Sequence, residues 1–186
     1  MACFCVFAGA ASGPDDSYAK EVEYLAQKLT MQGHEFIYGG GSTGLMGAFA
    51  DGVIKAEGTI TGVIPHFLND REIGHKEVSR LITTDTMHER KKLMYDAADA
   101  FLILPGGLGS LDETMEVLTW RQIGLLQCDM YILNYKSYWQ PMADLLDHVV
   151  TMGFMHTSQF DYLHWADDAP SMLSLLETIS PDGRDS

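Results

Sequence analysis

Positive charge is scarce in this chain of 186 residues, which has 12 Lys and Arg compared with 26 Asp and Glu and a formal net charge of −14. Nucleic acids and anionic membranes attract proteins mainly through clustered positive charge, so the composition argues against both as partners. An anionic ligand such as a phosphate would need a local positive pocket in this acidic protein.

Cysteines and long hydrophobic runs are also few. Cys3, Cys5 and Cys128 show neither C-x-x-C nor metal-ligand spacing, and their odd number argues against a disulfide framework. The seven histidines form no HExxH or i,i+4 pattern, which argues against a metal site. No segment reaches the roughly 18 apolar residues of a membrane span, and the apolar run over residues 2–11 lacks the basic segment of a signal peptide. We therefore predict a cytoplasmic protein with no membrane segment.

The length and the composition predict one domain. With 46% apolar residues, a chain of this size can bury one core but is short for two. We expect a single domain over residues 1–180 and a flexible tail over residues 181–186.

Strand-length apolar segments alternate with segments of helical spacing along the whole domain. Strands are expected at residues 2–8, 35–38, 59–64, 80–83, 100–104, 130–133 and 162–165. Helices are expected at residues 17–32, 45–57, 86–98, 111–127, 137–152 and 171–179. This alternation predicts an α/β fold, a single-domain Rossmann-like, doubly wound and mostly parallel sheet with helices on both faces.

Two glycine-rich turns, at residues 39–44 and 105–110, each follow a predicted strand and open a predicted helix. Both turns should lie at the carboxyl edge of the sheet, where their N–H groups can converge on one phosphate. Neither turn is a Walker A loop or a full GxGxxG motif, which favours a mononucleotide or sugar phosphate over ATP hydrolysis or NAD chemistry. The alternative is that the glycines only permit close packing of strand and helix. The candidate binding residues in the turns are Gly40, Ser42, Thr43, Gly106, Gly107, Leu108, Gly109 and Ser110.

Carboxylates follow the second turn at once. Ser110 and Glu113 have the spacing of a capping box, which would explain Glu113 by structure alone. A carboxylate in the first helical turn would also be held ionised by the helix dipole, and could orient water and stabilise an oxocarbenium-like state at a ribose. Asp112, Glu116 and Thr119 share one helical stripe that could line the pocket, or could form an ordinary polar helix face.

The densest basic cluster of the chain is Arg90-Lys91-Lys92. Arginine is suited to bidentate recognition of phosphate, and lysine supplies a flexible point charge. The alternative is a solvated face of the predicted helix over residues 86–98. The spacing alone does not decide between these two interpretations.

Taken together, the motifs at residues 38–47, 62–65, 87–91 and 105–113 resemble the LOG ("lonely guy") family. Members of this family are cytokinin riboside 5′-monophosphate phosphoribohydrolases, often mislabelled as lysine decarboxylases. The resemblance runs from Val6 to about Phe154. It implies a Rossmann-like homodimer that hydrolyses the N-glycosidic bond of AMP or N6-substituted AMP to the free base and ribose 5-phosphate, with no metal or redox cofactor.

The resemblance also implies roles for individual residues. Arg90 and Glu113 match the catalytic pair of the family. Positions that contact substrate in the family match Lys91, Gly106, Gly107, Gly109, Ser110, Asp112 and Thr119.

The first loop departs from the family pattern, because Ala10 and Ala11 stand where hydroxyl side chains are usual. This departure leaves open a rival hypothesis, a non-catalytic Rossmann-like carrier of a nucleotide or cofactor. The presence of both Arg90 and Glu113 favours the enzyme.

Overall fold

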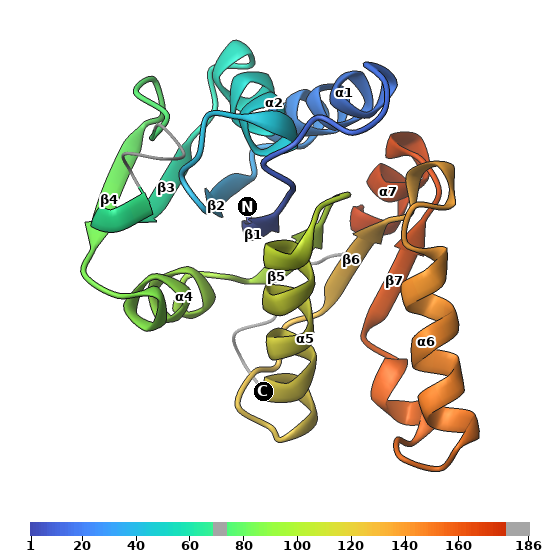
Figure 1. Ribbon diagram of the computed structural model, residues 1–186. Coiled ribbons are helices and arrows are strands. Elements are labelled where there is room, and N and C mark those ends of the chain that lie inside the picture. Colours follow the sequence, from blue (N-terminus) through green and yellow to red (C-terminus); the bar gives the residue numbers. More distant parts are fainter. Residues whose placement is uncertain (69–73, 178–186) are drawn as a thin grey trace.

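The structure is a computed structural model that describes residues 1–68 and 74–177. The predicted tail and residues 178–180 therefore lie outside the described residues, as does the middle of the segment that follows the third strand. Within the described part, one parallel sheet carries helices on both faces, so the predicted fold class is confirmed (Figure 1). No helix in these two ranges has the length and apolar character to cross a membrane.

The sheet has seven strands in the order β4-β3-β2-β1-β5-β6-β7, and all neighbouring strands are parallel. The strands are β1 (Cys3–Phe7), β2 (Glu35–Tyr38), β3 (Ile60–Pro65), β4 (Arg80–Thr84), β5 (Ala100–Ile103), β6 (Met130–Leu133) and β7 (Leu163–Ala166). The chain winds outward from β1 to β4, returns to the centre at β5, and winds outward again to β7. The strand order thus reverses between β1 and β5, and ligands of doubly wound sheets bind at this point, beyond the carboxyl ends of the strands.

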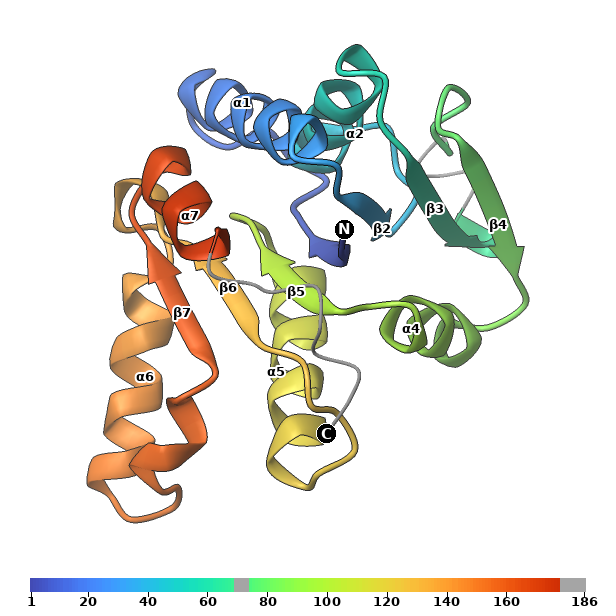
Figure 2. The ribbon, with the colours of Figure 1, turned by 180° about the vertical axis from the view of Figure 1, so that it is seen from behind.

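The helices divide between the two faces of the sheet (Figures 1 and 2). They are α1 (Ser17–Met31), α2 (Gly44–Lys55), α4 (Met87–Asp96), α5 (Leu108–Gln122), α6 (Gln140–Thr151) and α7 (Ala169–Leu176). Side chains alternate along β1: Phe4 and Val6 pack with α1, α2 and α7, whereas Cys5 and Phe7 pack with α4, α5 and α6. Burial on both faces explains why this strand is a continuous apolar run.

The beginning of α5 differs from the prediction. The helix starts at Leu108, three residues before the predicted residue 111, and ends at Gln122 instead of residue 127. Gly107 is extended (φ −97°, ψ −152°) and occupies the N-cap position, and the first helical hydrogen bond runs from Leu111 N to Gly107 O (3.0 Å). The glycines around this start are poor helix formers, so the helical pattern in the sequence becomes visible only after the first turn.

Candidate active site

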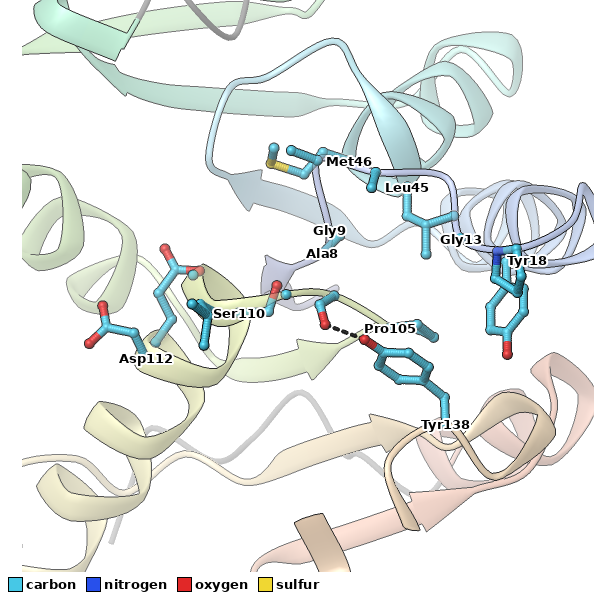
Figure 3. A pocket seen from close by; sticks show the side chains of 18 of the residues that line it. Ala8, Gly9, Gly13, Tyr18, Leu45, Met46, Pro105, Ser110, Asp112 and Tyr138 are labelled. Carbon is cyan, nitrogen blue, oxygen red and sulfur yellow. Dashed lines mark hydrogen bonds between the residues drawn. The ribbon is translucent and has the colours of Figure 1, made fainter. Parts of the chain in front are cut away.

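A pocket of about 490 Å³ opens at the switch point between β1 and β5. Its walls come from six places in the chain: the loop after β1 (residues 8–14), Tyr18 on α1, the start of α2, the start of α4, the segment over residues 105–113, and Tyr138 after β6. Figure 3 shows most of this lining. Its volume lies in the usual range for small-molecule sites. The pocket therefore has both the place and the size expected for a ligand of a doubly wound fold.

The start of α5 presents open backbone N–H groups to this pocket. Leu108, Gly109 and Ser110 line it and form the first three positions of the helix. The first N–H groups of a helix have no partner within the helix, and no side chain in residues 1–68 and 74–177 caps α5. Among the described residues, none of these three amides has a protein acceptor. This is the geometry of an anion site, with the positive end of the helix dipole behind it.

The other glycine turn, at residues 39–44, is built differently. Leu45 N donates to Ala11 O (3.3 Å) and Met46 N donates to Gly9 O (3.1 Å), so the loop after β1 occupies two of the first amides of α2. Gly44 permits this contact, because it has φ +61° and a Cβ there would lie 2.3 Å from the carbonyl carbon of Ala10. The expectation that amides of both turns converge on one phosphate is therefore wrong for Leu45 and Met46.

Glu113 lines the same pocket, but it does not form a capping box. It is the sixth residue of α5, and the N-cap residue is Gly107, not Ser110. The predicted effect of the dipole was also wrong, because that effect falls off within the first turn and burial dominates here. Burial raises the pKa of Glu113 from 4.5 to about 7, although the positive charges of Arg90 and Lys91 oppose this rise. The carboxyl group can therefore gain or lose a proton near neutral pH.

Arg90 reaches the pocket from the first turn of α4 and is 7% exposed. Its Nη2 donates to Gly39 O (3.2 Å) and its Nη1 makes a weak contact with Met87 Sδ (3.7 Å). Its Nε is buried and has no partner among the described residues. A Cβ on Gly39 would lie 2.1 Å from Nη2, so the absence of a side chain at Gly39 lets the guanidinium approach the turn. A buried donor without a partner costs free energy, which an acceptor on a bound ligand would recover.

The basic cluster separates in three directions instead of forming one solvated face. Lys91 Nζ lies 2.7 Å from Asp112 Oδ2 and 3.0 Å from Glu116 Oε2, while Lys92 pairs with Asp96 (2.5 Å). Burial alone would lower the pKa of Lys91, but the hydrogen bonds and charges of the two carboxylates outweigh it and raise the pKa. Lys91 thus remains charged beside the pocket wall.

The pocket brings together eight of the predicted site residues, and the described lining does not include the other six. The eight are Arg90, Gly106, Gly107, Leu108, Gly109, Ser110, Asp112 and Glu113, and the six are Gly40, Ser42, Thr43, Lys91, Glu116 and Thr119. Glu116 accepts from Tyr95 Oη (2.8 Å) behind the wall, and the exposed Thr119 donates to Met115 O (2.8 Å). Roles of these six in binding stay predictions.

Sequence reasoning missed the apolar and aromatic part of the lining, to which Tyr18, Leu45, Met46, Met87 and Tyr138 belong. All of these except Met87 are labelled in Figure 3. Leu45, Met46 and Met87 lie within the motifs at residues 38–47 and 87–91, but nothing in those motifs marked them as lining residues. Tyr18 and Tyr138 belong to no motif, so only the fold identifies them. One local sequence signal does mark the start of α4, the helix that carries Met87 and Arg90. The Thr-x-x-Glu spacing before Arg90 marks a helix start, and Thr86 Oγ1 indeed accepts from Glu89 N (3.1 Å).

The fold and the pocket define a Rossmann-like α/β protein in which two helices place a carboxyl group and a guanidinium in a pocket at the switch point of the sheet. A family model described as "Possible lysine decarboxylase" matches residues 46–176. The cytokinin riboside 5′-monophosphate phosphoribohydrolase LOG2 of Arabidopsis thaliana is 37% identical over 177 residues, 95% of this chain and 83% of the relative. The probable enzyme LOGL9 of Oryza sativa subsp. japonica is 37% identical over 95% of this chain and 78% of its own. The chain belongs to the LOG family of phosphoribohydrolases, as its motifs indicated.

Family membership confirms the predicted enzyme class, since the named relatives are phosphoribohydrolases and hence N-glycosidases. Solved structures confirm the fold. The molybdenum cofactor carrier protein of Chlamydomonas reinhardtii superimposes with a TM-score of 0.71 over 95% of this chain and 96% of its own, at 18% identity. At that identity the likeness shows the fold alone.

Proposed function

We propose that this protein hydrolyses the N-glycosidic bond of N6-substituted AMP, or of AMP itself, to the free base and ribose 5-phosphate. One observation carries the proposal: Glu113, with a pKa of about 7, shares a pocket with the buried Arg90 and with the open amides at the start of α5. The names of the relatives support the same reaction.

The phosphate is proposed to bind at the start of α5. The amides of Leu108, Gly109 and Ser110 would donate to its oxygens, and the helix dipole would stabilise its negative charge. The sugar and base would then extend along the rest of the pocket, where Met46 and Met87 supply apolar surface. Methionine adapts to ligands of different shape, which suits a base with a variable substituent.

Glu113 is proposed to act on the water and on the sugar. A bond forms between the water oxygen and C1′ of the ribose as the bond from C1′ to the base nitrogen breaks, and the electron pair of the broken bond leaves with the base. Ionised Glu113 accepts the proton of the water and stabilises the positive charge at C1′, and the base takes up a proton from solvent. A pKa near the working pH is the best value for such a general base.

Arg90 is proposed to hold the phosphate or the departing base, as the donor that completes the site. Its Nε, which has no partner in the described part of the chain, and its weakly bonded Nη1 leave hydrogen-bonding capacity for an acceptor on the substrate. The positive charge of Arg90 would also stabilise the negative charge that develops on the base as the bond breaks.

A lysine decarboxylase activity fits the chain less well. Such chemistry with pyridoxal phosphate needs a lysine that can act as a nucleophile, and nucleophilic lysines have a lowered pKa. Lys91, beside the pocket, instead has a raised pKa and is held by two carboxylates.

The direct experiment is incubation of the protein with AMP and with N6-isopentenyl-AMP, followed by detection of free base and ribose 5-phosphate. We expect release from at least one of them. Binding without release from either would contradict the hydrolase and would support the rival hypothesis, a non-catalytic carrier of a nucleotide or cofactor.

A homodimer is part of the proposal, because the family resemblance implies it. Light scattering on the purified protein would test it. Large apolar side chains that remain exposed on and after α5 offer surface for such a contact: Leu108, Ile123 and Leu125 are 85%, 62% and 65% exposed.

A further inference from the structure

Tyr138 reaches the pocket from the β6 side of the switch point (Figure 3). It follows β6, lines the pocket, and donates its hydroxyl to the carbonyl oxygen of Gly106 at 2.5 Å (Figure 3). The two residues are 32 positions apart in the sequence, and no motif of the family resemblance includes Tyr138. The hydrogen bond therefore joins the second glycine turn to a different part of the chain.

The Gly106 carbonyl belongs to the same peptide group as the Gly107 N–H. A trans peptide is planar, with its C=O and N–H on opposite sides, and the structure has no cis peptide among its described residues. Fixing the carbonyl on the side of Tyr138 therefore fixes the Gly107 N–H on the other side. The hydrogen bond to the carbonyl also polarises the peptide and makes its N–H a stronger donor. Gly107 is the N-cap residue of α5, directly before the three open amides.

The backbone on both sides of Tyr138 is held in a fixed conformation. Lys136 and Ser137 both have left-handed conformations, with φ +53° and +57°, which side-chain-bearing residues adopt rarely. Asn134, which is buried, accepts from Trp139 N through Oδ1 (2.8 Å) and from Ser137 N through its backbone oxygen (2.9 Å). These bonds hold the strained segment in place on both sides of Tyr138.

The ring of Tyr138 is 39% exposed and contacts two other aromatic rings. It meets Trp139 edge-on with a centroid distance of 4.9 Å, and Tyr18 edge-on at 6.2 Å. A phenylalanine ring can keep both contacts, so the hydroxyl can be removed with little change in packing.

We propose that Tyr138 is a positioning residue for the phosphate of the substrate, acting through the Gly106–Gly107 peptide. The inference rests on the proposed function, in which that phosphate binds at the start of α5. Its signature is selective: loss of the hydroxyl weakens binding of a phosphorylated ligand and leaves the same ligand without phosphate unaffected.

The test compares Tyr138→Phe with the wild type by calorimetric binding of AMP and of adenosine, both proteins carrying Glu113→Gln for these titrations so that AMP is not hydrolysed. KM and kcat are measured with Glu113 intact. We expect the Kd for AMP to rise about five- to tenfold, the Kd for adenosine to stay within twofold, and KM to rise with little change in kcat. Tyr135→Phe is the matched control, because it removes a hydroxyl from the same segment at a residue that does not line the pocket. The control should leave all these quantities within twofold.

Two outcomes would overturn the inference. Equal AMP binding by the wild type and Tyr138→Phe would show that the hydroxyl does not position the phosphate, and equal losses for AMP and adenosine would show a general structural role. Neither outcome touches the proposed reaction, which fails only if the wild type releases no base from AMP and N6-isopentenyl-AMP. Thermal unfolding of both variants verifies that they are folded.

Discussion

The two glycine turns of this protein look alike in the sequence and differ in the structure. Both follow a parallel strand and open a helix at the carboxyl edge of the sheet. The turn before α2 gives two of its helix amides to the loop after β1, whereas the amides at the start of α5 remain open to the pocket. A glycine-rich strand-to-helix turn is therefore not a phosphate site by itself, because a neighbouring loop can occupy its donors.

The first turn still serves the site, but indirectly. Its Gly39 carbonyl binds Arg90, and its helix holds the loop after β1 in place. The second turn and the helix behind it face the pocket directly, with open amides and Glu113. The first turn is therefore a scaffold, and the second turn is the ligand-binding element. Substitutions in each turn should separate these two roles.

The largest effect is expected for Glu113→Gln, which removes the proton acceptor from the second turn's helix and keeps its shape. We predict that kcat falls by roughly 10³-fold, in the range of general acid–base contributions. Steady-state release of base from N6-isopentenyl-AMP measures it. Glu77→Gln, an exposed carboxylate outside the pocket lining, is the control. A folded Gln variant within tenfold of the wild type would show that Glu113 is not the general base.

Alanine at one glycine of each turn separates stability from binding. Gly44→Ala places a Cβ against the Ala10 backbone at a positive φ, so we predict that it lowers the free energy of unfolding by about 2 to 5 kcal/mol. The Cβ of Gly107→Ala would meet no atom of the described residues within 4 Å, so the unfolding free energy of this variant should change by at most about 0.5 kcal/mol. Because its methyl group keeps the phosphate from the backbone, its Kd for AMP should rise about tenfold, or about 1.4 kcal/mol.

Denaturant unfolding and calorimetric AMP binding measure the two quantities for each variant. The comparison of the turns would be broken by the opposite pattern, in which Gly107→Ala unfolds the protein and Gly44→Ala leaves it stable but unable to bind AMP.

The pH dependence of stability tests the burial of Glu113. The pKa is about 7 in the folded protein and 4.5 when the group is solvated, so the folded state binds more protons between these values and the wild type loses stability as pH rises from 4.5 to 7. The two pKa values differ by about 2.5, which corresponds to up to about 3 kcal/mol. Glu113→Gln should therefore match the wild type near pH 4 and exceed its free energy of unfolding at pH 8. Denaturant titrations at both pH values measure this, and an equal stability at pH 8 would contradict the raised pKa.

Arg90→Lys tests the indirect role of the first turn. Lysine keeps the charge but lacks the planar fork that reaches both Gly39 O and a ligand, so kcat/KM should fall about 10²-fold. Gly39→Ala, which displaces the guanidinium, should reproduce this loss. If Gly39→Ala retains full activity, the first turn does not position Arg90.

The smallest effect is expected for Thr119→Ala. Thr119 lies nine residues after Ser110, about 14 Å along the helix axis, and its hydroxyl binds Met115 O. We predict a change in kcat/KM of at most about twofold, within the ±0.5 kcal/mol typical of surface positions. A larger loss of kcat/KM in a folded variant would show that this end of α5 contacts a substrate, although Thr119 does not line the pocket of the single chain.

The fold was predictable because its elements have strong local signals, whereas Arg90 and Glu113 were identified by the family resemblance. Continuous apolar strands, helical spacing and glycine turns identified the seven strands and six α-helices of the described residues, including the two edge strands β4 and β7. Their ends were predicted to within about three residues, except for the end of α5, and the two short 3-10 helices were not predicted. Arg90 and Glu113 entered through motifs, and the structure places both in one pocket.

The ionisation of Glu113 was not predictable, because it depends on burial by segments distant in the sequence. Ser110 and Glu113 have the spacing of a capping box. The helix starts at Leu108, however, so both residues lie inside it and neither caps it. Likewise, which turn keeps its amides open depends on a loop about 35 residues earlier in the chain, and Tyr138 joins the site only through the fold.

The most direct test of the account is a crystal structure of the Glu113→Gln variant with AMP bound. The account predicts phosphate oxygens within hydrogen-bond distance of the amides of Leu108, Gly109 and Ser110, and the anomeric carbon beside residue 113. A phosphate bound instead at the first turn, on Ser42 or Thr43, would contradict the assignment of scaffold and ligand-binding roles to the two turns.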